Sequence, residues 1–425
     1  MSRNVVLTTV TRCAMVVAGF ASSIVSARVL GPTGRGDFFF VVTVAATVVQ
    51  FSNLGLHSSN TYLVSRDRSL LQPLIANSLW VSLVVGLVGG GISVFVLRIF
   101  DVIPNAPARE LWYVIALAPP LLFFLLGANL LVGVNRIGTF NVIEALGRLL
   151  VLAAFGATAL VAAHAGAFLL ASTAAWVCTC VVLLWTLVRG ETASLAFDRS
   201  AFVTGFRYAA KAYLVALLGF LVLRSSVFLL ERMTTAKDVG YFSVSAQIAD
   251  VLAIIPTSVA LVLFPDLVRD KSRRWSLTMR SSAVVLVILA AVCVVVAVVA
   301  GPLIRVVYGH GFSPSVGILN WLLPGVVGLG VTSVVSQYVA AIGMPRVVVA
   351  VWFGIFAFAV VLGFFLIRRN GVDGAAQALS ITYWISFFLL LGIADRYRRR
   401  QARDEGSGGM GSPAAVDPEP EPPWL

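Results

Sequence analysis

Long apolar runs, separated by short polar links, fill most of this chain of 425 residues. About 20 mostly apolar residues are enough to cross a bilayer as a helix. Hydrophobic residues make up 59% of the chain and charged residues only 12%, which excludes an ordinary soluble protein. We expect about twelve spans, at residues 5–30, 38–64, 73–97, 111–134, 141–163, 165–188, 206–230, 239–267, 282–304, 316–341, 347–367 and 374–393.

These spans are predicted to be helices, so the fold class is an all-α polytopic membrane protein. Lipid offers no partners to backbone polar groups, so only helices and closed barrels can span it. The alternating pattern of barrel strands is absent from the sequence. Arg and Lys favour the links on the N-terminal side of the membrane by about two to one, which predicts that both termini are cytoplasmic. The same topology explains the net charge of +12 without nucleic acid as a partner.

One sequence pattern occurs twice, about 204 residues apart. The first copy is a span carrying Arg12, a compact turn at residues 31–36 and a new run that opens with Gly-Asp-Phe. The second copy is a span carrying Arg224, a link at residues 234–239 and a run that opens with Gly-Tyr-Phe. Such a repeat predicts two matched halves, although the two arginines do not fall on equivalent positions.

We therefore expect three parts in the chain. They are an N-terminal half at residues 1–199, a C-terminal half at residues 200–395 and a cytoplasmic tail at residues 396–425. The tail is rich in Gly, Pro and acidic residues, and it contains too little apolar surface to order itself, so we expect it to be disordered.

Motifs for catalysis are missing from the sequence. It contains no nucleophile elbow, P-loop, HExxH motif or dinucleotide fingerprint. The three histidines are scattered, and the four cysteines lie inside apolar runs without a CxxC pair. We predict that the chain is not an enzyme and that it needs no cofactor or metal.

Ionisable residues within the spans are the first functional candidates. A charge at mid-bilayer costs at least ~2.5 kcal/mol, so it usually faces the bundle interior or a wet cavity. Arg12 and Arg224 have no acidic residue within one helical turn, which favours a cavity that receives an anion. Glu144 and Arg148 are four residues apart and can pair, so a structural salt bridge is one interpretation. Glu144 and Asp250 are also the candidates for ion coupling.

Uncharged polar residues in the second span are the next candidates. Eight of them lie between residues 50 and 61, which is too polar for a helix facing lipid. This stretch must face protein or water. We expect Asn53, His57 and Asn60 to bind substrate together with Gln247 of span eight, whereas helix–helix hydrogen bonding is the alternative for each one alone.

Residues 27–38 read ARVLGPTGRGDF and resemble the ARxLGPxGxGxF signature of bacterial polysaccharide-type flippases, the Wzx-like transporters of O-antigen and teichoic-type polymers. That family belongs to the MOP superfamily, with the MATE exporters and the lipid II flippases. Residues 53–62, 239–245 and 255–265 also resemble it, so the likeness extends from the first span to about residue 374. The resemblance implies two six-helix bundles around a central cationic cavity.

The resemblance further implies export of undecaprenyl-diphosphate-linked oligosaccharide across the bacterial cytoplasmic membrane by alternating access. Arg12, Arg148 and Arg224 would bind the diphosphate, and the polar part of the second span would bind sugar hydroxyls. The expected partners are membrane lipids and, in the same pathway, a polysaccharide polymerase and glycosyltransferases. The family often has an acid two residues after the span-seven arginine, but Ser226 stands there, which puts coupling through that position in doubt.

Three other functions stay open on the sequence alone. A MATE-like multidrug or cation antiporter would need acidic cavity residues, and only Glu144 and Asp250 are available. A membrane glycosyltransferase or ligase would need a sizeable loop outside the membrane, and the internal links are about ten residues long. A scaffold that binds cell-wall partners through its tail is the third.

Overall fold

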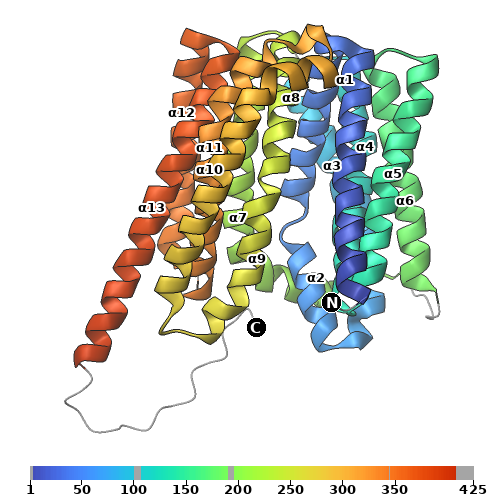
Figure 1. Ribbon diagram of the computed structural model, residues 1–425. Coiled ribbons are helices and arrows are strands. Elements are labelled where there is room, and N and C mark those ends of the chain that lie inside the picture. The colour runs from blue at the N-terminus through green and yellow to red at the C-terminus, as the bar shows by residue number, and fades with distance from the viewer. Residues whose placement is uncertain (1–2, 100–106, 190–195, 344, 408–425) are drawn as a thin grey trace. The chain divides into compact units, whose positions relative to one another are not determined.

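The computed structural model describes residues 3–99, 107–189, 196–343 and 345–407. In these ranges the chain is helical, with short links and no strand, so the predicted all-α fold class is confirmed (Figure 1). The elements are α1 (Arg3–Ser52), α2 (Leu56–Arg66), η1 (Arg68–Leu70), α3 (Leu71–Ile99), η2 (Glu110–Trp112), α4 (Tyr113–Gly133), α5 (Ile137–Val161), α6 (Ala165–Val188), α7 (Arg199–Met233), α8 (Ala236–Leu252), α9 (Ile254–Arg269), α10 (Arg274–Val307), η3 (His310–Phe312), α11 (Ser315–Ala341), α12 (Arg346–Asn370) and α13 (Val372–Ser407).

Eleven helices in the described residues are long and apolar enough to cross a membrane. The chain is therefore a multi-pass membrane protein. The 50 residues of α1 count once among the eleven, although a kink at Gly31 joins two helices there. The count of twelve spans and the cytoplasmic position of the termini stay predictions.

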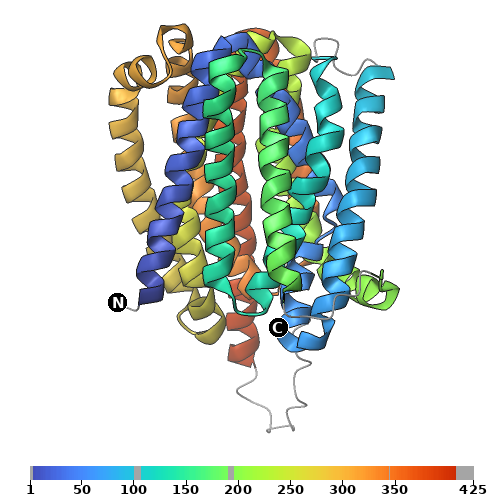
Figure 2. The same cartoon turned by 90° about the vertical axis from the view of Figure 1, so that its right-hand side faces the viewer.

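The reversal inside α1 depends on one residue. Gly31 has φ 64° and ψ −178°, and Pro32 follows it at the start of the second arm. Glycine adopts positive φ without steric cost, and proline suits the first position of a helix because no N–H is needed there. Figures 1 and 2 show α1 as two arms that run in opposite directions. The predicted turn over residues 31–36 was too long, because residues 33–36 are already helical.

A second break corrects the predicted span at residues 38–64. α1 ends at Ser52 and α2 begins at Leu56, and between them Leu54 and Gly55 have φ 49° and 78°. The Asn53 side chain stabilises the break, since its Oδ1 accepts a hydrogen bond from the Gly55 N–H at 2.9 Å. The 11 residues of α2 extend about 16 Å, too short to span a bilayer.

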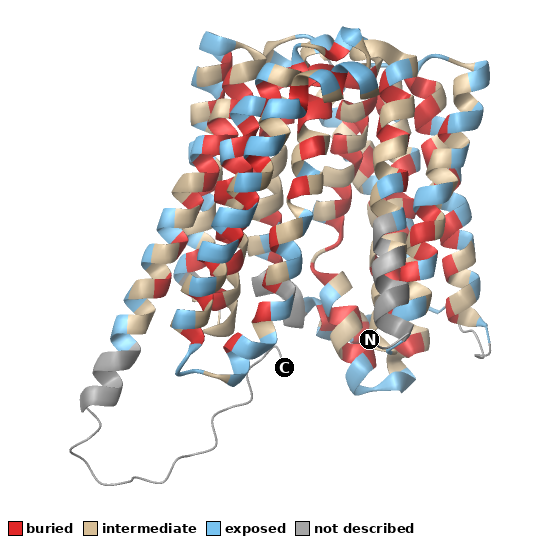
Figure 3. Ribbon diagram, in the orientation of Figure 1, coloured by how far each residue is buried: buried red, intermediate tan, exposed pale blue. Residues whose placement is uncertain are grey.

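Contacts divide the chain into two compact units. Unit 1 comprises Met1–Gln247 with Leu303–Ser315, and unit 2 comprises Ile248–Pro302 with Val316–Leu425. These units do not test the functional halves expected from the sequence repeat, so the boundary at residue 199 stays a prediction. Figure 3 shows buried and exposed residues alternating along individual helices, as expected for helices with one packed face and one free face.

Unit 1 buries a core of Leu, Ile and Phe side chains between α2, α3, α4, α5 and α6, including Leu63, Ile75, Leu130 and Leu183. The opposite face of α3 is also apolar but exposed, for example at Leu83, Leu87 and Ile92. Large exposed apolar faces are unusual in water, whereas they are the normal surface of a helix that faces lipid.

Unit 2 contains a proline-containing helix, α11, that is supported by α13. The Trp384 indole N–H donates to the Pro324 carbonyl at 3.0 Å, and the Ser380 hydroxyl donates to the Trp321 carbonyl at 2.5 Å. Pro324 has no N–H to donate within the helix, and these two bonds from α13 connect its turn to the neighbouring helix. The helix α13 continues to Ser407, so the tail predicted as disordered from residue 396 is helical at 396–407. Residues 408–425 lie outside the described ranges.

Two short links share a sequence pattern and a local hydrogen-bond pattern. Residues 66–69 read RDRS and residues 269–272 read RDKS, 203 positions later. Asp67 accepts hydrogen bonds from the N–H and hydroxyl of Ser69, and Asp270 accepts from the Ser272 hydroxyl and the Arg273 N–H. These bonds lower the pKa of both exposed carboxyls below the usual value of aspartate.

Candidate functional site

Two of the sequence motifs meet inside unit 1, where the start of the second α1 arm lies against α8. We call this region the signature junction and define it as residues 23–36 with residues 236–245. At its centre is Arg35, whose side chain is only 3% exposed. Its guanidinium donates to Ser26 Oγ at 2.6 Å, Ser23 Oγ at 3.0 Å and Ser243 Oγ at 3.3 Å. A cation assigned to a polar link by the sequence is therefore buried and held by neutral hydroxyls.

The two helices of the signature junction approach closely because of two glycines. A Cβ at Gly36 would overlap the carbonyl of Ala236, and a Cβ at Gly240 would overlap the carbonyl of Pro32. The pairs are reciprocal, since Gly36 and Gly240 are 204 positions apart and so are Pro32 and Ala236. This is the spacing of the predicted repeat, so the contact joins positions that the repeat predicts to be equivalent.

The signature arginine Arg28 caps a helix. Its Nε donates to the Val307 carbonyl at 2.8 Å, and another of its N–H groups donates to the Val306 carbonyl. The last carbonyls of a helix have no partner within it, and a cation is favourable there. Thus Arg28 stabilises the end of α10, and the signature as a whole holds helices together.

The break between α1 and α2 is the second polar region, which we call the polar break and define as residues 50–61. Its backbone is supported from α7, where the Tyr213 hydroxyl lies 3.0 Å from the Gln50 carbonyl oxygen and 2.9 Å from that of Phe51. One hydroxyl proton can serve only one of these carbonyls at a time. One of the two carbonyl oxygens can therefore accept a hydrogen bond from another donor.

Asn53 and His57 come together in the polar break. Asn53 is fully buried, its Oδ1 lies 2.7 Å from His57 Nδ1, and its Nδ2 has no hydrogen-bond partner among the described residues. His57 is half-buried, and its Nε2 lies 3.0 Å from the exposed Ser58 hydroxyl. Burial lowers the pKa of His57, so its ring is neutral at pH 7 and can donate to Asn53 while it accepts from Ser58.

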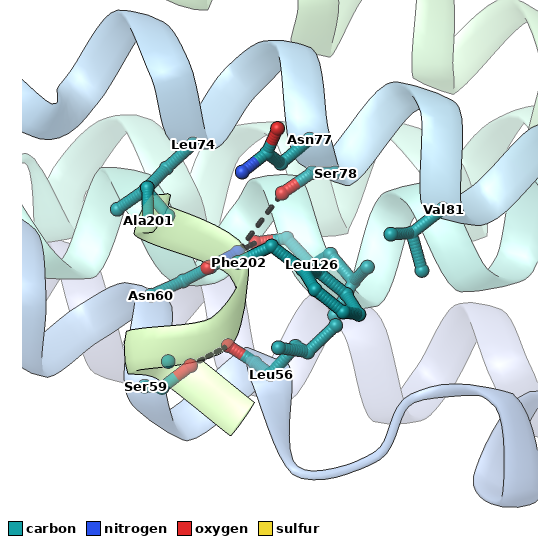
Figure 4. Close-up of a pocket in the computed structure, with 11 residues that line it drawn as sticks. Leu56, Ser59, Asn60, Leu74, Asn77, Ser78, Val81, Leu126, Ala201 and Phe202 are labelled. Carbon is teal, nitrogen blue, oxygen red and sulfur yellow. Dashed lines mark hydrogen bonds between the residues drawn. The ribbon is translucent and has the colours of Figure 1, made fainter. Parts of the chain in front are cut away.

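Asn60 has a different role, as Figure 4 shows. Its Nδ2 donates to Ser78 Oγ at 2.9 Å and to the Leu126 carbonyl at 3.2 Å. The small pocket beside it encloses about 10 Å³, room for roughly one water molecule. The residues around it are Leu56, Ser59, Leu74, Asn77, Ser78, Val81, Leu126, Ala201, Phe202 and Gly205. Asn60 therefore joins α2 to α3 and α4 within a packed region.

The predicted arginines lie next to aromatic rings. Arg148 is exposed, with its guanidinium carbon 5.9 Å from the centre of the Trp176 ring, and the described contacts include no ion pair with Glu144. Arg224 is half-buried, 5.9 Å from the Phe220 ring. The side chain of Arg12 lies outside the described residues. These rings stabilise a guanidinium without neutralising its charge.

The remaining candidates are less closely grouped. Gln247 is half-buried near the end of α8, whereas Glu144 is half-buried on α5 and Asp250 is exposed. The structure thus brings Asn53 and His57 into contact, places Asn60 in packing, and leaves a shared site for the other candidates a prediction.

Sequence reasoning missed three buried polar groups. They are Arg35, assigned to a link, Tyr213, and Glu231, which lies one residue beyond the end of the predicted seventh span. Only Arg35 carried a usable signal, since the serines at positions 23 and 26 lie 12 and 9 residues before it in the chain.

Comparison with known proteins agrees with this architecture. The family model of polysaccharide biosynthesis proteins matches residues 1–271, whereas a search of curated proteins finds no match. Among solved structures, the chain is similar to the lipid II flippase MurJ in an inward closed conformation, with TM-score 0.76, 12% identity and coverage of 92% of this chain and 87% of that one.

Two transporters of the MOP superfamily are also similar. An inward-facing multidrug resistance MATE transporter gives TM-score 0.72 at 14% identity, covering 91% of this chain and 96% of that one. A transporter from Pyrococcus furiosus, described as having a binding pocket of reverse polarity, gives TM-score 0.62 at 13% identity, covering 92% and 94%. These proteins are transporters and flippases rather than enzymes. The chain therefore belongs to the polysaccharide biosynthesis protein family, and its fold is similar to that of MOP-superfamily transporters.

Proposed function

We propose that this protein is a flippase that moves undecaprenyl-diphosphate-linked oligosaccharide across a bacterial cytoplasmic membrane for surface polysaccharide synthesis. The family supports a lipid-linked cargo. The observation that carries the proposal is the polar break. Irregular backbone at membrane depth is tolerated only where it is buried in protein or lines a wet cavity, and transporters use such broken helices at their binding sites.

The polar break supplies the groups that a sugar needs. Asn53 has an unused amide donor, Ser58 has an exposed hydroxyl, and the Gln50 and Phe51 carbonyls share one donor. Sugar hydroxyls both donate and accept hydrogen bonds, so they match a mixed set of this kind. Thr61 belongs to the same stretch, but its hydroxyl already donates to the Asn129 carbonyl at 3.0 Å.

The diphosphate would be bound by arginine. Guanidinium groups form charge-assisted, often bidentate bonds with phosphate. Arg148 suits this role because it is exposed, is stacked near Trp176, and has no carboxylate partner among the described contacts. We assign Arg12 and Arg224 to the same group of diphosphate ligands, and the polyprenyl chain stays in lipid. The halves at residues 1–199 and 200–395 then rock to expose the cargo on the other side, with polymerase and glycosyltransferases as pathway partners.

Transport in vesicles tests this function. The full chain is reconstituted with a fluorescent undecaprenyl-diphosphate oligosaccharide, and arrival of the label at the opposite leaflet is followed by quenching. Arg148→Ala should slow transport about tenfold or more, because a hydrogen bond to a charged group is worth ~1.5–3 kcal/mol. Arg369→Ala, at an exposed arginine outside the proposed site, is the matched control and should be neutral.

Two results would contradict the proposal. Equal transport by Arg148→Ala and Arg369→Ala would remove Arg148 from the diphosphate site. Export of cationic drugs, with no movement of the lipid-linked sugar, would instead favour the MATE-like antiporter, in which Glu144 and Asp250 would bind the cation.

A further inference from the structure

A buried carboxyl group next to the signature junction has no described role in cargo binding. Glu231 lies near the end of α7, its side chain is 0% exposed, and neither carboxyl oxygen has a hydrogen-bond partner among the described residues. An isolated carboxylate is very costly in such a place. A buried carboxyl without a donor therefore persists as the neutral acid.

A second carboxyl group lies within electrostatic range of Glu231. Asp37 on α1 acts electrostatically on Glu231, and Glu110 in η2 acts on Asp37. Both α7 and η2 pack against α1. Two acids that interact at close range share protons as a pair, and like charges disfavour double ionisation.

The charged residues of the signature junction and the adjoining link have other partners. Arg35 is held by three serines, Arg28 caps α10, Lys237 lies 5.8 Å from the Tyr241 ring and Asp238 bonds to Thr235. Arg232 is the next residue along α7 after Glu231, and Tyr308 acts electrostatically on Arg35. None of the ion pairs in the described part of the chain involves Glu231.

We propose that Glu231 and Asp37 form a proton-binding site, with the proton held on Glu231 in the packed state of the signature junction. The ligand is a proton rather than a metal ion, because the described residues contain no group of three His, Cys, Asp or Glu that could hold one. Calcium and magnesium need more oxygen ligands than two carboxyls provide.

The position of the pair links the proton to the junction. Asp37 directly follows Gly36, and Glu231 lies five residues before Ala236, the residue whose carbonyl faces Gly36. When the proton leaves, an unpaired carboxylate remains in a dry site, and hydration of that carboxylate requires the helices to separate. Proton release therefore loosens the signature junction. This inference does not depend on which cargo the protein carries.

Infrared spectroscopy on the full chain in dodecyl maltoside, a detergent without a carbonyl group, tests the site. A protonated carboxyl has a C=O stretch that a carboxylate lacks. We expect this band at pH 7, its loss in Glu231→Gln, and its retention in the control Glu144→Gln, a half-buried acid on α5. Retention in Asp37→Asn would place the proton on Glu231. Absence of the band, or its loss in Asp37→Asn alone, would overturn the assignment.

Thiol labelling tests the link to the junction without infrared data. Ser243→Cys is introduced into a chain whose four native cysteines are replaced. The new cysteine is labelled with a water-soluble maleimide, and its labelling rate is measured at each pH with Glu231 present and with Glu231→Gln. We expect the labelling rate of the chain with Glu231, divided by that of the Glu231→Gln chain, to rise at alkaline pH, because only the chain with Glu231 can lose the proton. A constant ratio would overturn the coupling. Asp37→Asn serves as the second variant if Glu231→Gln does not fold.

Discussion

The signature junction and the polar break lie at opposite ends of the same helical arm, and they use polar residues in opposite ways. At the junction, three serines satisfy Arg35, and two glycines bring the backbones into direct contact. At the break, Asn53 keeps an unpaired donor and two carbonyls share one hydroxyl. A buried polar group costs free energy when it has no partner. The polar groups of the break can therefore still gain hydrogen bonds, whereas those of the junction already have them.

This difference separates the residues that identify the family from those suited to cargo. The signature motif is easy to recognise because packing permits few alternatives at Gly36 and Arg35, and the positive φ of Gly31 favours glycine there. The break is less regular in sequence, since several polar side chains can offer hydrogen bonds to a sugar. We therefore expect substitutions at the junction to lower stability and substitutions at the break to change transport.

The largest effect is expected from Gly36→Ala. The new methyl group would overlap the Ala236 carbonyl, which is backbone and cannot rotate away. Overpacking of this kind costs about 3 kcal/mol, so the apparent Tm in detergent should fall clearly. Gly19→Ala on the same helix is the control, because nothing lies within 4 Å of that position, and it should be neutral or slightly stabilising. Similar Tm values for the two variants would mean that the helices do not touch at Gly36.

A smaller loss is expected from Arg35→Met. The change keeps the length of the side chain but removes the bonds to Ser23, Ser26 and Ser243. Because Ser26 also donates to the Ser22 carbonyl, the hydroxyls keep some partners, and we expect about 2 kcal/mol. The unfolding midpoint of Arg35→Met should therefore lie below that of Arg109→Met, which changes an exposed arginine. If transport is lost while stability is unchanged, Arg35 acts on cargo and the comparison fails.

Helix positions could be predicted well wherever an apolar run is bounded by polar residues. The span at residues 165–188 matches α6, because His164 and Arg189 border an uninterrupted apolar segment. The break at residues 53–55 was missed, since counting apolar residues does not reveal positive φ. A search for Asn followed by Gly two residues later would have suggested it, because the Asn53 side chain bonds the Gly55 N–H.

The site was harder to predict than the fold because its partners are distant in sequence. Arg35 is buried only because Ser243 and α8 cover it, 208 residues away. Asn60 was expected to bind substrate, but Ser78 and Leu126 satisfy its amide. Single-residue chemistry identifies which side chains need partners, whereas only the packed structure shows which of them remain unpaired.

The smallest effect is expected from pH at His57 in the polar break. Burial lowers the pKa of His57 below the ordinary value of 6.5, so the unfolded chain binds this proton more readily than the folded chain. Stability should therefore be lost as pH falls through 6.5, where the unfolded histidine becomes charged. His57→Gln keeps a neutral polar side chain and should lose less stability between pH 7 and pH 5. Identical pH profiles would show that His57 is as accessible to protons as in the unfolded chain, and the polar break would then be wetter than its burial indicates.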